Sequence, residues 1–281
     1  AIIDRDVVGA MRGLCTGCEI DLDDRTPVGI AQQLTEAGLT VRAVADPVAP
    51  LRMVKDAQEL DALSRAGHIT ARALEQVADT ITVGDREADV ARRLEAAFAE
   101  WGAEDRAFAT IVAGGENSAL PHHRAGDRQL AVGDLLVIDC GAKVEGYHAD
   151  MTRTFVVGAA PDEWQHEIHS LVLRAQEAAR DALAPEVIAG DIDAAARELI
   201  TQAGFGEAFA HGTGHGVGLD IHEQPMLSAR SSAVLPEHAV VTVEPGIYLP
   251  GRGGVRIEDT VVVAHAPQVL TDLERGLTRV G

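Results

Sequence analysis

The segment 135–155, LLVIDCGAKVEGYHADMTRTF, constrains the fold more than any other part of the chain. Its apolar start at 135–138 and the alternating pattern at 147–157 predict two β-strands joined by a tight turn. We place the centre of this turn between Val144 and Glu145. The segment is therefore expected to form an antiparallel hairpin.

Acidic side chains are placed symmetrically in this hairpin and in a second one. Asp139 and Asp150 lie the same distance from the first turn centre, so we expect them to face each other, and Glu244 and Glu258 are equidistant from Gly251. Opposed side chains have Cβ atoms roughly 4.5–5.5 Å apart, and like charges there are destabilising. At an effective dielectric near 20, two charges 4 Å apart repel by roughly 4 kcal/mol. Four converging carboxylates predict bound cations; the alternative is surface acids whose symmetry is accidental.

Histidines are concentrated in segment 211–222, HGTGHGVGLDIH, which holds three of them with four glycines and is too glycine-rich for a helix. The glycine spacing superficially resembles a phosphate loop, but such a loop must open a helix, and HEQP does not begin one. We instead expect the glycines to allow close backbone approach while a histidine supplies a nitrogen ligand. His122 and His123 add candidates, and for His123 we favour a structural role.

Charge and cysteine content limit the partners. The net charge of −20 without a basic cluster argues against nucleic acid and anionic membrane. No apolar run reaches the length of a membrane helix, and no signal segment opens the chain. Cys15, Cys18 and Cys140 include a lone CxxC pair, which lacks the second pair a zinc site needs. The pattern suits a reducing compartment, so we predict a cytoplasmic protein.

The first fifty residues differ from the rest. Their pattern predicts a βαβ unit made of strand 19–22, helix 27–37 and strand 40–44. One such unit cannot bury both faces of its sheet, so we interpret residues 1–50 as the C-terminal remnant of a larger α/β domain. Pro47 and Pro50 mark the linker.

Residues 51–281 alternate helix pairs with strands, which predicts an α+β fold. Apolar spacing of three and four predicts helices at about 60–81, 90–101 and 164–179, and a fourth that Asp191 N-caps and that ends at Gly204. Asp139 and Glu244 are 105 residues apart, and Asp150 and Glu258 are 108 apart. Two similar halves, each presenting an acid hairpin at their interface, are the simplest architecture.

In chain order, the five predicted ligands resemble the dinuclear metal site of the pita-bread metallopeptidases: Asp139, Asp150, His215, Glu244 and Glu258. The phrases DCGAKVEGYHADMTRTF, HGTGHGVGLDIHEQP, VEPGIY and GVRIED are most similar to the Xaa-Pro branch, which comprises prolidase (Xaa-Pro dipeptidase) and aminopeptidase P. The resemblance implies a pita-bread catalytic domain over residues 51–281 and a homodimer. It also implies two divalent metal ions; the donor set suits Mn²⁺, with Co²⁺ and Zn²⁺ as alternatives.

The same resemblance implies a role for each ligand. Asp150 and Glu258 would bridge both ions, His215 and Glu244 would complete one site, and Asp139 would chelate the other. A hydroxide shared by the ions would attack the bond between an N-terminal residue and proline.

The remaining site residues would serve the substrate, a proline-containing peptide. Glu244 would move the proton, and His122 and His222 would steady the carbonyl and the oxyanion. His211 and Arg256 would line the pocket, although for Arg256 an ordinary ion pair with a neighbouring acid is an alternative.

Two other functions use the same fold. One is a metal-free C–N hydrolase like creatinase, and the other is a non-catalytic binding module. Retention of all five ligands favours the peptidase. Because relatives carry a complete N-terminal domain that shapes the pocket, the sequence leaves dipeptide and longer substrates open.

Overall fold

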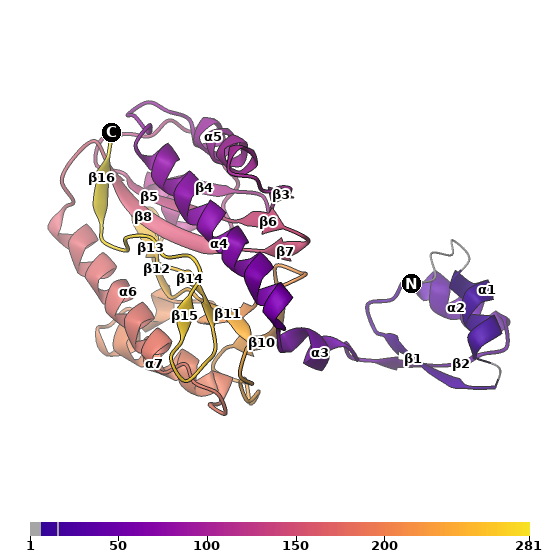
Figure 1. Ribbon diagram of the computed structural model, residues 1–281. Coiled ribbons are helices and arrows are strands. Elements are labelled where there is room, and N and C mark those ends of the chain that lie inside the picture. The colour runs from indigo at the N-terminus through magenta and orange to yellow at the C-terminus, as the bar shows by residue number, and fades with distance from the viewer. Residues whose placement is uncertain (1–6, 16) are drawn as a thin grey trace. The chain divides into compact units, whose positions relative to one another are not determined.

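The computed structural model describes residues 7–15 and 17–281 of the chain (Figure 1). Two compact units divide between Leu51 and Arg52. Of the predicted N-terminal segment, residues 1–6 and Thr16 lie outside the described residues. In the described part of the chain, no helix combines the length and the apolar character needed to cross a membrane.

The N-terminal unit contains the predicted βαβ unit, made of β1 (Glu19–Asp23), α2 (Val28–Glu36) and β2 (Thr40–Val44). The two strands are parallel, and a small core forms around Ile20, Leu34 and Leu39. The sequence pattern did not predict α1 (Val7–Leu14). Pro50, expected in a linker, instead lies in the short helix α3 (Ala49–Met53), near its start, where proline is tolerated.

The second unit contains the four predicted helices, namely α4 (Ala57–Ala78), α5 (Glu87–Glu100), α6 (Glu163–Asp181) and α7 (Ala189–Gln202). Asp56 and Glu59 form a capping box that begins α4. The predicted N-cap of α7 is wrong, because Ile188 occupies that position and Asp191 lies in the first turn. The helix ends as predicted before Gly204, which has a φ of +87°.

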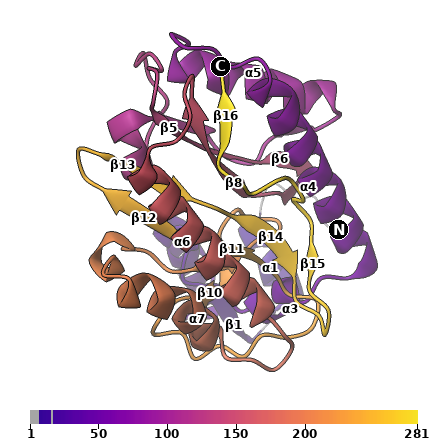
Figure 2. The ribbon, with the colours of Figure 1, turned by 90° about the vertical axis from the view of Figure 1, so that its left-hand side faces the viewer.

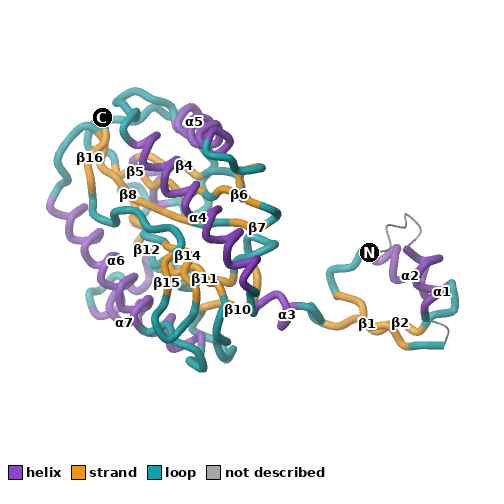
Figure 3. Tube along the Cα trace, in the orientation of Figure 1, coloured by secondary structure: helices purple, strands orange, loops and turns teal. Residues whose placement is uncertain are grey.

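The strands of this unit form two halves (Figure 3). In the first half, a four-stranded sheet has the order β16 (Thr278–Val280), β8 (Met151–Val157), β5 (Leu135–Cys140) and β4 (Ile111–Gly114). A three-stranded sheet beside it has the order β3 (Asp105–Arg106), β6 (Ala142–Val144) and β7 (Tyr147–His148). In the second half, a five-stranded sheet has the order β10 (Glu223–Leu227), β9 (Gly214–Gly216), β11 (Val240–Val243), β14 (Asp259–Val262) and β15 (Gln268–Val269). The pair β12 (Gly246–Leu249) and β13 (Gly253–Arg256) completes it.

Each helix pair covers the strands of its own half (Figure 2). Leu74 of α4 and Leu94 of α5 belong to a buried cluster with Ile138 of β5. Ile168 of α6 and Ile192 of α7 belong to another buried cluster, which includes strand residues of the second half. The helices therefore shield the outer sheet surfaces, and the hairpins occupy the interior.

The register predicted for the first hairpin is wrong. Asp139 pairs with Thr152 rather than with Asp150. The turn consists of Glu145 and Gly146, whose φ angles of 50° and 85° fit a type I′ turn. The turn centre therefore lies one residue later than predicted, which shifts every cross-strand partner by two.

The predicted single strand 147–157 is also interrupted, since it splits into β7 and β8 around Asp150. The interruption lies opposite Gly141, where an added Cβ would be 1.8 Å from the carbonyl oxygen of Ala149. Only glycine permits this close approach, so the hairpin bends there between two sheets. Asp150 lies at the bend.

The second hairpin has the predicted register. Val243 pairs with Asp259 on one side of the two acids, and Gly246 pairs with Arg256 on the other side. Both pairs fit the register in which Glu244 lies opposite Glu258. This hairpin is also interrupted at its two acids, between β11 and β12 and between β13 and β14.

The two hairpins meet along β8. The Thr260 hydroxyl donates to the Asp150 carbonyl at 2.8 Å, and the Glu258 amide donates to the Thr152 carbonyl at 3.1 Å. The Thr154 hydroxyl donates to the Arg256 carbonyl at 2.8 Å. The contacts advance by two residues along each strand, so they lie on one face and bring the acid-bearing segments together.

Candidate metal centre

A cavity of about 380 Å³ lies where the two hairpins and the histidine-rich segment converge. The residues that line it include all nine predicted site residues, namely His122, Asp139, Asp150, His211, His215, His222, Glu244, Arg256 and Glu258. Segments separated by more than 130 residues therefore supply one site.

The three most closely grouped candidate ligands are Asp150, His215 and Glu258, whose ligand atoms lie within 4.8 Å of one another. Nε2 of His215 is 3.7 Å from Oδ2 of Asp150 and 3.4 Å from Oε1 of Glu244. Nδ1 of His215 lies 2.9 Å from the Gly216 carbonyl, which assigns the proton to Nδ1. The lone pair of Nε2 then faces the acids, as a metal ligand requires.

Asp139 joins the group as a diagonal neighbour of Asp150, since Thr152 is its direct partner and lies two residues from Asp150 on the same face. Its Oδ2 accepts a hydrogen bond of 2.6 Å from Nη2 of Arg256. Its Oδ1 is buried and has no hydrogen-bond partner among the described residues. An unpaired buried oxygen is costly, and a bound cation would satisfy it.

Burial and mutual repulsion perturb the acids. Burial, followed by the charges of Glu258 and Asp139, raises the pKa of Asp150 well above its ordinary value. Burial, then the charges of Glu244 and Asp139, does the same to the pKa of Glu258. Burial also raises the pKa of Glu244 and lowers the pKa of His215. Buried carboxylates beside a neutral imidazole are the donor set of hard or borderline divalent cations, so the residues fit such ions.

A family comparison agrees with this donor set. The sequence model of metallopeptidase family M24 matches residues 61–265, which include every predicted ligand. The chain belongs to metallopeptidase family M24. Its α+β architecture is the pita-bread fold of that family, as the sequence predicted, and dependence on divalent metal is a property of the family.

Individual relatives of this M24 peptidase are proline-directed enzymes by name. It is 45% identical over 237 residues to the Xaa-Pro dipeptidase of Pyrococcus furiosus, covering 84% of this chain and 68% of that protein. The structure of prolidase from Pyrococcus furiosus has a TM-score of 0.92 at 39% identity, covering 97% of this chain and 81% of that one. The X-Pro aminopeptidase of Thermotoga maritima MSB8 also has a TM-score of 0.92, at 40% identity, covering 97% of this chain and 77% of that one.

A chain of hydrogen bonds crosses one wall of the M24 site. Nη1 of Arg256 donates to the Tyr248 hydroxyl at 2.9 Å, and that hydroxyl lies 2.8 Å from Nε2 of His211. Burial raises the pKa of Tyr248 to about 12, so its hydroxyl stays protonated. The hydroxyl therefore donates a hydrogen bond to Nε2 of His211. Nδ1 of His211 is 2.8 Å from the Gly212 carbonyl. Burial lowers the pKa of His211, which keeps the ring neutral.

Tyr248 was not selected from the sequence, although a signal was present. It lies four residues after Glu244 in a strand-like segment, and residues two and four apart share a face of a strand. Arg256 was predicted either to line the pocket or to form an ordinary ion pair with a neighbouring acid. It lines the cavity and forms an ion pair there with Asp139.

The other histidines occupy different places. The ring of His222 contacts that of His215 edge-on, with centroids 4.3 Å apart. His122 lines the cavity, whereas Nε2 of His123 is 2.8 Å from the buried carboxylate of Glu87. Glu223, next to His222, accepts hydrogen bonds from Lys55 at 3.1 Å and from Arg52.

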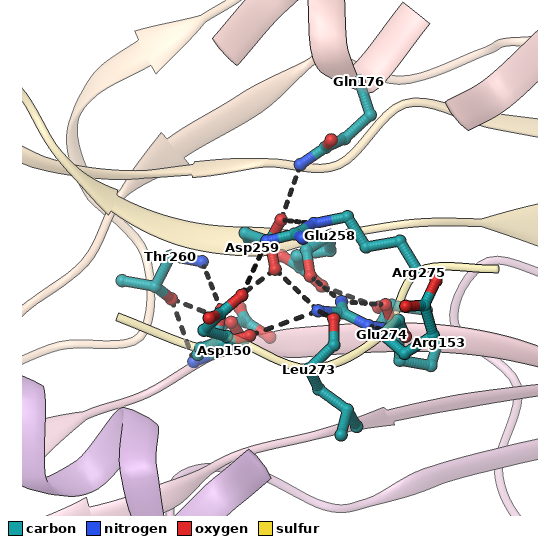
Figure 4. A network of polar contacts seen from close by, with 12 residues as sticks. Asp150, Arg153, Gln176, Glu258, Asp259, Thr260, Leu273, Glu274 and Arg275 are labelled. Atoms are coloured by element: carbon teal, nitrogen blue, oxygen red, sulfur yellow. Dashed lines mark hydrogen bonds and ion pairs between the residues drawn. The ribbon is translucent and has the colours of Figure 1, made fainter. Parts of the chain in front are cut away.

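A buried ion pair, between Arg153 and Asp259, lies beside the candidate ligands Asp150 and Glu258 (Figure 4). Nη2 of Arg153 donates to Oδ1 of Asp259 at 2.8 Å, and Nη1 donates to the carbonyls of Thr152 at 2.9 Å and Glu258 at 2.6 Å. Arg153 thus links the two hairpins at the point where they meet.

The same network reaches α6 and the segment that connects β15 to β16. Arg153 also donates to the carbonyls of Thr271, Leu273 and Glu274. Asp259 accepts from Gln176 at 2.7 Å and from Arg275 at 2.6 Å. Sequence reasoning missed this pair, although an arginine in the predicted strand 147–157 was an indication of a buried partner.

Proposed function

We propose that this protein hydrolyses the peptide bond between an N-terminal residue and proline, with two divalent cations, most suitably Mn²⁺, held by the cavity. The observation that carries the proposal is the convergence of Asp139, Asp150, His215, Glu244 and Glu258 on one cavity. The names of its relatives support the choice of substrate. The tertiary amide of an Xaa-Pro bond lacks an N–H, so a dedicated pocket is physically reasonable.

In this proposal each ligand has a defined role. Asp150 and Glu258, whose ligand atoms form a group with that of His215 within 4.8 Å of one another, would hold both ions. His215 and Glu244, 3.4 Å apart, would help to hold one ion, and Asp139 would help to hold the other with its unpaired Oδ1. When bound, the cations supply an attacking water of lowered pKa and polarise the scissile carbonyl.

The chain's own groups handle the proton and the developing charge. Glu244 accepts the proton of the attacking water and delivers it to the prolyl nitrogen, because its carboxylate lies in the cavity among the other candidate ligands. His122 and His222 line the same cavity and donate to the carbonyl oxygen as it becomes an oxyanion. The two ring nitrogens of His211 form hydrogen bonds with Tyr248 and with the Gly212 carbonyl, so His211 contacts the substrate through its ring carbons.

Turnover of Ala-Pro, Ala-Pro-Ala and Ala-Ala by metal-stripped protein, before and after adding Mn²⁺, tests the function. We expect metal-dependent cleavage of at least one proline peptide, no cleavage of Ala-Ala, and about two dications per chain by elemental analysis. Cleavage of Ala-Pro alone would indicate a dipeptidase, and cleavage of Ala-Pro-Ala an aminopeptidase. Full activity without metal would contradict the proposal.

We also propose a homodimer in the cytoplasm. The sequence holds an odd number of cysteines with a lone CxxC pair, a pattern that suits a reducing compartment better than a disulfide scaffold. Sedimentation of the purified chain tests the dimer, since a monomer at micromolar concentration would contradict it.

A further inference from the structure

In each half of the catalytic unit, the second helix carries a buried carboxylate. Glu87 begins α5, and Asp193 lies one turn into α7; both are fully buried. They are 106 residues apart, close to the separation of the paired acids in the two hairpins. Neither is among the described residues that line the cavity. Each carboxylate instead binds a segment that carries one of the cavity's histidines.

Glu87 binds both ends of the segment that carries His122. Its Oε1 accepts hydrogen bonds of 2.9 Å from the amide of Gly114 and from Nδ2 of Asn117. Its Oε2 accepts one of 3.3 Å from the amide of Gly126 and lies 2.8 Å from Nε2 of His123. One carboxylate therefore closes the loop between 114 and 126, and His122 projects from it into the cavity.

Asp193 binds the segment that carries His211. Its Oδ1 accepts hydrogen bonds of 3.0 Å from both the amide and the hydroxyl of Thr213. It also pairs with Arg197, whose Nε lies 2.7 Å from Oδ2 of Asp193. Arg197 in turn donates to the carbonyls of Phe209 at 2.9 Å and His211 at 2.6 Å.

Ring contacts strengthen this second attachment. The guanidinium of Arg197 lies 4.2 Å from the ring centroid of Phe209, and Phe209 contacts His211 edge-on at 5.1 Å. The orientation of His211 is thus set from behind by α7 and from the side by Tyr248. Contacts on both the backbone and the ring leave the histidine little rotational freedom.

We infer that Glu87 and Asp193 are positioning residues, one in each half, that place His122 and His211 respectively in the cavity. The inference rests on the proposed function for the roles of the two histidines. His122 acts on the oxyanion, so loss of Glu87 should affect the chemical step. His211 lines the substrate wall, so loss of Asp193 should affect binding.

Steady-state kinetics with the Mn²⁺-loaded protein and Ala-Pro separates the two effects. We expect Glu87→Gln to lower kcat by about 10-fold to 100-fold with KM changed less than about threefold. We expect Asp193→Asn to raise KM by about 10-fold to 100-fold with kcat changed less than about threefold. Both substitutions preserve size but replace one acceptor oxygen with an NH₂ group.

Matched controls lie on the same helices. Glu100→Gln on α5 and Asp191→Asn on α7 change exposed side chains of the same types, and we expect both constants to stay within about twofold. If either positioning variant fails to fold, Asn117→Ala and Thr213→Val each remove one donor to the same carboxylate and should change the same constant by a smaller factor. Equal changes of kcat and KM in both variants, or changes no larger than those of the controls, would overturn the inference.

Side-chain NMR of histidine-labelled, metal-free protein gives a readout that does not depend on activity. With assignments from His122→Gln and His211→Gln, Glu87→Gln should shift the ring signals of His122 more than those of His211, and Asp193→Asn should do the reverse. Shifts without this selectivity would overturn the inference. If the wild type cleaves only Ala-Pro-Ala, the same kinetics are measured with that peptide. Absence of turnover of both Ala-Pro and Ala-Pro-Ala would contradict the proposed function and leave the NMR outcome to decide the positioning roles.

Discussion

The two acid hairpins reach the same cavity through different strand pairing. In the second hairpin, one continuous register brackets Glu244 and Glu258 and makes them opposed. In the first, Asp139 and Asp150 are diagonal neighbours across a bend. What they share is the face of the strand. Because side chains two residues apart point to the same side, a shift of two residues leaves the acids in the site, whereas a shift of one would remove them.

The largest effect is expected when one acid is removed from either hairpin, because both hairpins supply the same site. We expect Asp150→Asn and Glu258→Gln each to lower Mn²⁺-supported kcat/KM for Ala-Pro by about 10³-fold, roughly 4 kcal/mol of transition-state stabilisation. Metal content and turnover measure the effect. A large loss from one substitution and near-normal activity from the other would break the comparison and contradict shared bridging.

The threonines that support the second hairpin's acids should differ. The Thr152 hydroxyl donates to Glu258 at 2.6 Å, whereas the Thr242 hydroxyl lies 3.3 Å from Glu244. A hydrogen bond to a charged group contributes about 1.5–3 kcal/mol, so we expect Thr152→Val to weaken Mn²⁺ binding by about tenfold or more. Thr242→Val should weaken it by less than about threefold. Calorimetric titration with Mn²⁺ measures both, and the reverse order would be a contradiction.

Metal-free protein should show the cost of assembling the acids. The folded pKa of Glu258 is raised above its ordinary value of 4.5, so between that value and the raised one the folded state binds more protons than the unfolded state. Stability conferred by the protonated form is therefore lost as pH rises through this window. Glu258→Gln should flatten the decline in the free energy of unfolding as the pH rises above 4.5.

Urea denaturation of stripped protein at several pH values measures this decline. Glu237→Gln, which changes an exposed acid, is the control and should leave the slope unchanged. An unchanged slope in Glu258→Gln would show that burial and repulsion from Glu244 and Asp139 do not raise the pKa of Glu258 in the folded state.

The smallest effects should come from the turns. Glu145 adopts a φ of 50° in a type I′ turn, a conformation that asparagine tolerates better. We expect Glu145→Asn to stabilise the protein by about 0.5 kcal/mol, and Gly146→Ala to destabilise it by about 1 kcal/mol. In the second hairpin, Gly251→Ala should cost a similar amount, because Gly251 has a φ of +71°. Thermal unfolding compares the three, and stabilisation by Gly146→Ala would contradict the turn assignment.

Much of the fold follows from local patterns. The spacing of apolar residues predicted the four helices of the second unit, since each buries one face against a sheet. The register of the first hairpin could not be read in the same way. It depends on whether a non-glycine residue, Glu145, accepts a positive φ, and the pattern of its neighbours does not record that.

The candidate site likewise contains residues that the sequence predicts and residues that only the structure identifies. The candidate ligands could be selected because acids and histidines are unusual in strands and glycine-rich loops, where burial demands a partner. Tyr248, Arg153, Glu87 and Asp193 were not selected, because their roles depend on contacts with residues distant in sequence. Only the folded chain reveals which carbonyl or amide each of them meets.

Arg153 has a consequence for biosynthesis. Its guanidinium is held by the carbonyls of Thr271, Leu273 and Glu274, which are translated after Glu258, the last proposed ligand. A nascent chain that has just completed Glu258 would contain every donor atom for the cations but lack the segment that braces them. Metal acquisition should therefore await emergence of these residues from the ribosome, which makes maturation of the enzyme a late event.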